Sequence, residues 1–248
     1  MTFNDLRTVM WKERKSLFRI QGRRGQTALI LITPILLAIA MPLQLGKDWV
    51  STAFSLIIAV IIPLLLVGTS VPAAFTSERE QHTLPTLLAS RLSDRAIFLG
   101  KMLTSVIFAW GATLVVLLLS LVTVNIANWD GQLIFYKPTL FAADVVISLL
   151  FATLTAGLGV LFSLRSDTVQ QAQQSLMAVM MIPLLLLQVG FFVLGTTPAG
   201  KETLKGIFES VTLEQASMII AGILAVLTLL ALFAANRSFQ RERLVLRS

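Results

Sequence analysis

Residues 139–164 read TLFAADVVISLLFATLTAGLGVLFSL, an apolar run that contains one charged residue, Asp144. A helix that rises about 1.5 Å per residue needs about 20 residues to cross a hydrocarbon layer about 30 Å thick, so this run is long enough. Its apolar residues are continuous and do not alternate with polar ones, which excludes a strand of a membrane barrel. The stretch therefore predicts a membrane-spanning helix.

Five further apolar runs have similar lengths and are likewise bounded by polar residues. The composition of the whole chain also indicates a membrane protein. Of its 248 residues, 56% are hydrophobic and 13% are charged, which is too apolar for a water-soluble globule. Lys47 and Asp48 separate the first two runs, which we expect to form a tight hairpin. We predict an all-α integral membrane protein in which residues 1–248 form a single domain. Its six spans are Thr27–Leu45, Val50–Phe75, Ala96–Val124, Thr139–Leu164, Ser175–Gly195 and Ala216–Ala235.

The basic residues are distributed unevenly between the two sides of these spans. Sixteen of the 20 Lys and Arg residues fall in residues 1–26, in the loops after the second and fourth spans, at Lys101, or in the tail 236–248. The positive-inside rule makes this side cytoplasmic. Both termini are therefore expected on the cytoplasmic side of the inner (plasma) membrane. The net charge of +7 is then mainly an orientation signal with some attraction for anionic lipid, and we expect no nucleic-acid partner.

The segment 1–26 precedes the membrane domain, for which we take residues 27–235. Apolar residues recur in it near helical spacing, which predicts an amphipathic helix along the cytoplasmic interface. The apolar residues are Phe3, Leu6, Met10, Leu17 and Phe18, and the charged residues expected largely on other faces are Lys12, Glu13, Arg14, Lys15 and Arg19.

Composition excludes several kinds of chemistry. The chain has no cysteine and one histidine, so we expect neither thiol chemistry nor a metal site. The segment from Gly195 to Lys201 has the spacing of a phosphate-binding loop, but Glu202 follows where magnesium binding requires Ser or Thr, and no strand precedes it. We therefore expect no nucleotide site and no cofactor in this chain, so that any ATP must be bound by another protein.

The most informative loop joins the second and third spans and reads FTSEREQHTLPTLLASRLSDR over residues 75–95. Thr83 can cap a short helix, and a proline at position 85 is tolerated in its first turn. Leu84, Leu87 and Leu88 then share one face of that helix. From the residues alone, this face could equally dock on a partner protein or lie on the lipid interface.

This pattern resembles the type-2 ABC exporter permeases. The residues that carry the resemblance are Glu78-Arg79-Glu80, Thr83-Leu84, Leu87-Leu88, Leu92-Ser93 and Gly100-Lys101, together with Trp11-Lys12-Glu13 near the N-terminus. The resemblance implies a homodimer or heterodimer of permeases, each docked to a cytoplasmic ABC ATPase subunit that binds ATP and Mg²⁺. It also implies that Leu84, Leu87 and Leu88 insert into a groove of the ATPase, with Glu78, Arg79, Glu80 and Thr83 as further coupling residues. For the exterior segment 196–215 it suggests short helices, whereas the sequence alone permits a mobile loop.

Two polar residues inside spans are candidates for a substrate pathway. Asp144 lies near the outer end of the fourth span, where it is either an interfacial acid near Lys137 or a contact for a cation or substrate. Gln188 lies near the middle of the fifth span, where interhelical hydrogen bonding and pathway lining are the alternatives. The small residues Ser148, Ala152 and Ala156 recur at a spacing of four, so the fourth span is expected to pack closely against a neighbour.

We expect the chain to be the permease subunit of an ATP-driven exporter whose substrate cannot be read from the sequence. One alternative is a haem-exporter B-type subunit of cytochrome c maturation, which has a similar span count and a related loop. A second alternative is a membrane enzyme or scaffold that uses no nucleotide.

Overall fold

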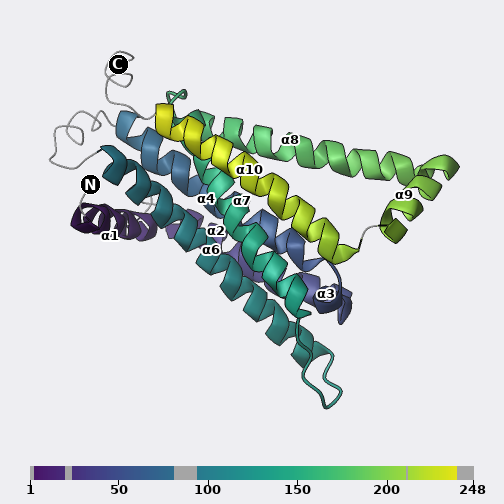
Figure 1. Cartoon of the computed structure of the whole chain (residues 1–248). Helices are drawn as coiled ribbons and strands as arrows, with labels where there is room; N and C mark the ends of the chain where they lie inside the picture. The colour runs from purple at the N-terminus through teal and green to yellow at the C-terminus, as the bar shows by residue number, and fades with distance from the viewer. Residues whose placement is uncertain (1–2, 20–23, 81–93, 211, 239–248) are drawn as a thin grey trace.

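The computed structural model describes residues 3–19, 24–80, 94–210 and 212–238, and within them every regular element is a helix. Their order along the chain can be followed in Figure 1. The helices are α1 (Phe3–Arg19), α2 (Arg24–Leu45), α3 (Asp48–Ser51), α4 (Ser55–Glu80), α6 (Asp94–Ala127), α7 (Pro138–Ser163), α8 (Val169–Thr196), α9 (Pro198–Ser210) and α10 (Leu213–Ser238).

Five of these helices are long and apolar enough to cross a membrane, and they correspond to the second to sixth predicted spans. They are α4, α6, α7, α8 and α10. The first predicted span is helical within α2, but the apolar stretch described there is shorter, Ile32–Leu45. The chain is therefore a multi-pass membrane protein, and a sixth crossing by α2 remains a prediction.

The expected hairpin between the first two spans is present, but the second span begins later than predicted. α2 ends before Gly46, whose φ of +57° is the left-handed conformation that commonly closes a helix. The Gly46 N–H donates to the Pro42 carbonyl at 2.8 Å, so the last turn is satisfied. The short helix α3 and residues 52–54 then precede α4, and Thr52 is extended. The predicted start at Val50 is thus wrong by about one turn.

The turn at the end of α2 is tied to the connection between α6 and α7. Lys47 donates a hydrogen bond to Asp130, and both side chains are about half exposed. This hydrogen bond, together with the charge of the ammonium, lowers the pKa of the Asp130 carboxyl below its ordinary value.

The main cluster of buried apolar side chains joins α4, α6 and α7, and α7 also packs between α4 and α10. The predicted small-residue face of α7 lies there, since Ser148, Ala152 and Ala156 are fully buried. A Cβ at Gly157 would lie 3.1 Å from the Ala231 Cβ on α10. A Cβ at Gly159 would lie 3.0 Å from the Val71 Cγ1 on α4. These small side chains allow the backbones to approach closely, which confirms the packing role predicted for this face.

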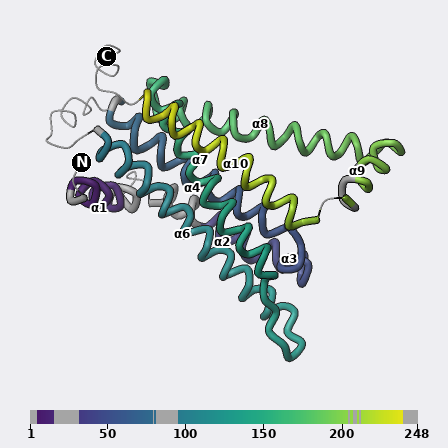
Figure 2. Tube along the Cα trace, in the orientation of Figure 1, coloured from purple at the N-terminus to yellow at the C-terminus, as the bar shows by residue number. Residues whose placement is uncertain are grey.

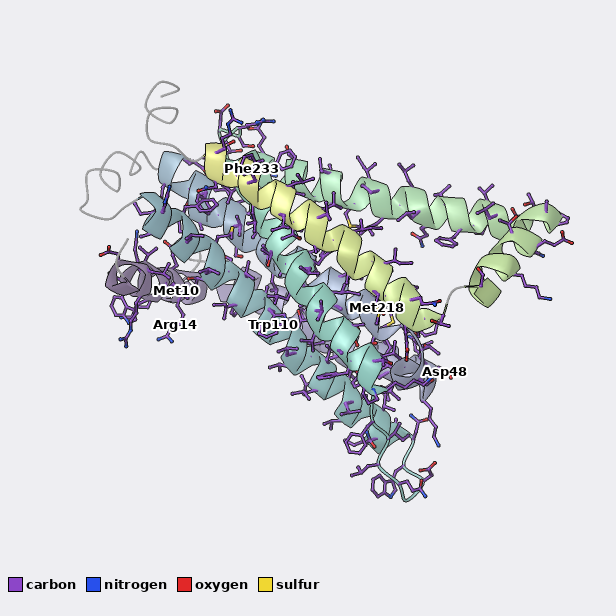
Figure 3. The ribbon with its side chains drawn as sticks, viewed as in Figure 1. Met10, Arg14, Asp48, Trp110, Met218 and Phe233 are labelled. Atoms are coloured by element: carbon purple, nitrogen blue, oxygen red, sulfur yellow. The ribbon has the colours of Figure 1, made fainter. Side chains whose placement is uncertain are left out.

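The bundle has two ends, which Figure 3 marks with labelled residues. Met10 and Arg14 of α1 lie at one end with Phe233, and Asp48 and Met218 lie at the other. We call these the α1 end and the α3 end. α1 and the last turns of α10 thus lie at the same end of the molecule (Figures 1 and 3).

α8 starts inside the bundle and leaves it along its length, as the traces in Figures 1 and 2 show. Its early residues Ala172, Leu176 and Met180 are buried, whereas every residue from 181 to 194 is exposed. α9 follows directly after α8, within the segment 196–215. Of the two alternatives for this segment, the short helix is therefore correct.

Candidate functional site

α1 is held against the start of α6 by one face. Leu6, Val9, Met10 and Glu13 form this face at helical spacing, with Val9 4% and Glu13 6% exposed. The expectation that Glu13 lies on a polar face of α1 is therefore wrong. Trp11 is instead 54% exposed, and the Lys15 ammonium lies 3.7 Å from the centre of its ring.

Gly100 makes this contact between α1 and α6 possible. A Cβ at Gly100 would lie 2.6 Å from Cγ1 and 2.8 Å from Cβ of Val9, which are closer than real Cβ contacts. The absence of a side chain therefore lets α1 cross α6 directly beside Lys101.

Lys101 joins three helices from a position that is 2% exposed. Its Nζ lies 2.8 Å from Oε1 of Glu78 on α4 and 3.4 Å from Oε1 of Glu13 on α1. It also donates to the carbonyl of Ala74 on α4 at 2.5 Å. We call Glu13, Glu78 and Lys101 the ion-pair joint.

All hydrogen-bond donors of the Lys101 ammonium have partners in or beside the joint. A lysine ammonium has three donors, and those of Lys101 face two carboxylates and one carbonyl. A buried charge is tolerated only when it is paired and hydrogen-bonded, and removing one partner of such a pair is strongly destabilising. Lys12 of α1 adds a second positive charge, with its Nζ 3.7 Å from Glu78 Oε1. The joint therefore fixes α1 to the ends of α4 and α6.

The end of α4 also contacts α8 through a second carboxylate. Glu80 Oε2 accepts a hydrogen bond from the backbone N–H of Val169 at 3.3 Å, at the first residue of α8. A negative charge at this position is favourable for the helix dipole. Glu78 and Glu80, two residues apart, thus connect one helix end to α1, α6 and α8.

The other predicted coupling residues lie next to this joint in the sequence. Arg79 belongs to α4, but its side chain is outside the described part. Thr83, Leu84, Leu87 and Leu88 fall in residues 81–93, which are also outside the described residues.

The two pathway candidates do not lie together, and neither belongs to the ion-pair joint. Asp144 is fully buried in the second turn of α7 near the α3 end, while Lys137 is exposed. Its carboxyl therefore faces protein in this conformation, and both alternatives for Asp144, an interfacial acid or a pathway contact, stay predictions. Gln188 lies in the exposed part of α8, where no hydrogen bond to another described residue is found. The expected interhelical bond is thus not made between described parts of this chain.

Sequence reasoning missed Glu13 and Lys101 as site residues, although one signal was present. Lys101 lies within the predicted third span, where an ionisable residue indicates function by default, but its charge was used only to orient the chain. Glu13 belongs to the Trp11-Lys12-Glu13 motif of the resemblance, but the motif does not indicate its burial, because the face that α1 buries is set by α6. No group of three or more His, Cys, Asp or Glu side chains suited to a metal is found among the described residues.

Comparison with known proteins supports the resemblance seen in the loop. Comparison with curated proteins gives no significant match. Residues 21–212 match the model of a family described as "ABC-2 family transporter protein", which covers more than half of the chain. This region includes the helices from α2 to α9 and the sequence segment after α4. Members of this family are permease components of ABC transporters and are not themselves nucleotide-binding enzymes. The chain therefore belongs to the ABC-2 transporter family of membrane permeases.

Proposed function

We propose that this protein is the permease subunit of an ATP-driven exporter and couples to a separate cytoplasmic ATPase that binds ATP and Mg²⁺. Family membership supports an ABC ATPase partner in general terms. The observation that carries the coupling proposal is the ion-pair joint at the end of α4. It lies directly before the segment that contains Leu84, Leu87 and Leu88.

The α1 end is the cytoplasmic end in this proposal. The segments that meet there are rich in lysine and arginine, whereas the α3 end has few basic residues. Six crossings with both termini inside follow if α2 also spans, and the inner (plasma) membrane is then the expected location. α1 would lie along the cytoplasmic interface with Trp11 exposed to it.

Movement of the segment with the three leucines would be passed to α4, which precedes it in the chain, and to α6, which follows it. When ATP closes the partner subunits, a groove that holds Leu84, Leu87 and Leu88 moves this segment with them. The segment connects α4 to α6, and the ion pairs of Lys101 link both helices to α1. The joint would therefore make the three helices move together, so that a displacement below the membrane changes access at the α3 end.

Recovery of the partner tests the proposal directly. The tagged chain, purified from its native membrane in mild detergent, is expected to carry with it a protein that hydrolyses ATP. The measurement is the ATPase activity of the eluate, and the control is a mock purification from cells without the tag. An eluate that contains the chain but no nucleotide hydrolysis would favour the scaffold alternative.

A second copy of the permease is proposed to pack on the outer half of α8. All of residues 181–194 are exposed, including the amide of Gln188 in mid-span. An amide facing hydrocarbon without a partner is unfavourable, and polar side chains in membrane helices commonly bond across an interface. In a two-fold dimer the same residue of the second copy can supply that bond.

Cysteine crosslinking tests this interface, because the natural chain has no cysteine. Gln188→Cys is expected to give a disulfide-linked dimer on mild oxidation in membranes. The matched control is Val115→Cys on α6, which is 56% exposed and also lies within a span, and it should stay monomeric. Equal crosslinking of both variants, or of neither, would exclude a homodimer through α8.

A further inference from the structure

Asp144 is a buried acid that the coupling mechanism does not use. It lies in the second turn of α7, where it is fully buried, and α4 packs against this helix. Ser55, the first residue of α4, is also fully buried, and its hydroxyl faces the Asp144 carboxyl. The pair therefore closes the contact between α4 and α7 near the α3 end.

Hydrogen bonding around Asp144 is incomplete. Neither carboxyl oxygen has a hydrogen-bond partner of normal geometry, and neither has the Ser55 hydroxyl. The nearby donors are already used: Trp49 Nε1 donates to the Tyr136 hydroxyl at 3.1 Å, and that hydroxyl donates to the Leu117 carbonyl at 3.2 Å. Burial also raises the pKa of Tyr136, so its hydroxyl keeps its proton.

Among the residues that the structure describes, no charged group compensates Asp144. The one titratable side chain of the neighbouring segments that faces it, among the described residues, is Tyr136. Lys137 at the start of α7, Asp48 of α3 and Glu214 of α10 are exposed, and Lys101 of α6 belongs to the joint near the α1 end. Lys47 pairs with Asp130.

The geometry also limits what can neutralise the acid. Both carboxyl oxygens are inaccessible, so no water-sized space borders them, and a coordinated alkali ion would need such a space. A proton needs none. A protonated carboxyl has one O–H donor, and the unpartnered hydroxyl of Ser55, which faces this carboxyl, can accept from it.

We propose that Asp144 is a proton-binding site whose occupancy is linked to the packing of α4 on α7. In the closed arrangement, the Asp144 carboxyl is protonated, and the Ser55 hydroxyl that faces it can accept a hydrogen bond from its O–H. When the α3 end opens, water reaches Asp144, the O–H bond breaks, and the proton passes to water as hydronium. Because the closed form holds the proton, raising the pH favours the open form and lowering it favours the closed form. This inference goes beyond the proposed function and does not depend on the ATPase.

Infrared spectroscopy of the purified full-length chain tests the occupancy. At neutral pH we expect a carbonyl stretching band of a protonated carboxyl, which lies well above the carboxylate bands. Asp144→Asn should lose this band, and Asp144→Glu should keep it at a changed frequency. The matched control is Asp130→Asn, which removes an exposed acid paired with Lys47 and should leave the band unchanged.

A labelling experiment tests the link to opening. A single cysteine at Val50, which is 2% exposed on α3, should react faster with a thiol reagent as the pH rises, after correction for thiolate formation on a free-thiol standard. In the Asp144→Asn background the corrected rate should not depend on pH. The proposal would be overturned by no band in the natural chain, by a band that survives Asp144→Asn, or by a corrected rate whose pH dependence is the same in both backgrounds. A band that appears only after sodium is removed would assign the site to an alkali ion and would also overturn it.

Discussion

Replacing Lys101 by methionine is expected to lower the free energy of unfolding by about 3–5 kcal/mol and to detach α1 from α6. Methionine has a similar length but no charge, so the variant leaves the buried Glu13 and the partly buried Glu78 without the Lys101 ammonium. The side chains alone are 8% and 15% exposed, which leaves little water to compensate for the lost ammonium. The measurement is thermal or chemical unfolding of the purified chain in detergent.

Lys47 provides a matched control for Lys101 in the same protein. It also pairs with an acid, Asp130, but about half of each side chain is exposed. Lys47→Met should therefore change stability little, because exposed ion pairs are screened by water and salt. Equal effects of Lys101→Met and Lys47→Met would show that the joint contributes nothing beyond an ordinary surface pair.

The charge argument can be separated from simple loss of packing. Adding Glu13→Gln and Glu78→Gln to Lys101→Met removes the two negative charges that Lys101 no longer compensates, so part of the lost stability should return. A triple variant less stable than Lys101→Met would contradict the view that uncompensated charge causes the loss.

The positions of the long helices could be predicted because hydrophobicity along one stretch of sequence decides them. The predicted span Thr139–Leu164 differs from α7, Pro138–Ser163, by one residue at each end. Contacts between helices could not be predicted in this way, because the neighbouring helix decides which face of a helix is buried. Glu13 is polar, yet it is buried because Gly100 lets α1 approach Lys101, a contact between residues about 90 positions apart in the chain.

The behaviour of polar residues inside spans was predictable only in part, for the same reason. The row of small residues on α7 indicated close packing from its spacing alone, whatever the neighbour. Asp144 could be recognised as unusual, but its burial depends on how α4 starts after the break at residues 52–54. Gln188 could be placed in a span, but the departure of α8 from the bundle is a property of the tertiary structure (Figure 2).

Replacing Leu87 by aspartate is expected to abolish co-purification of the ATPase while the chain still inserts and folds. In a helix that begins near Thr83, Leu87 lies between Leu84 and Leu88 on one face. Burying one leucine contributes about 1.5–3 kcal/mol, so losing it alone weakens binding roughly 10- to 100-fold, and the buried carboxylate adds a further cost. The measurement is the amount of ATPase recovered with the tagged chain.

Thr86→Asp is the matched control for this variant, because it adds the same charge to the same segment on the opposite face of the expected helix. It should retain the ATPase, and loss of the partner from both variants would point to the added charge and not to the leucine face.

The comparison with Lys101→Met then separates two roles. Leu87→Asp should remove the partner itself, whereas Lys101→Met should keep it bound but reduce its transport-coupled hydrolysis, because the leucines provide affinity and the buried joint transmits their movement to α1, α4 and α6.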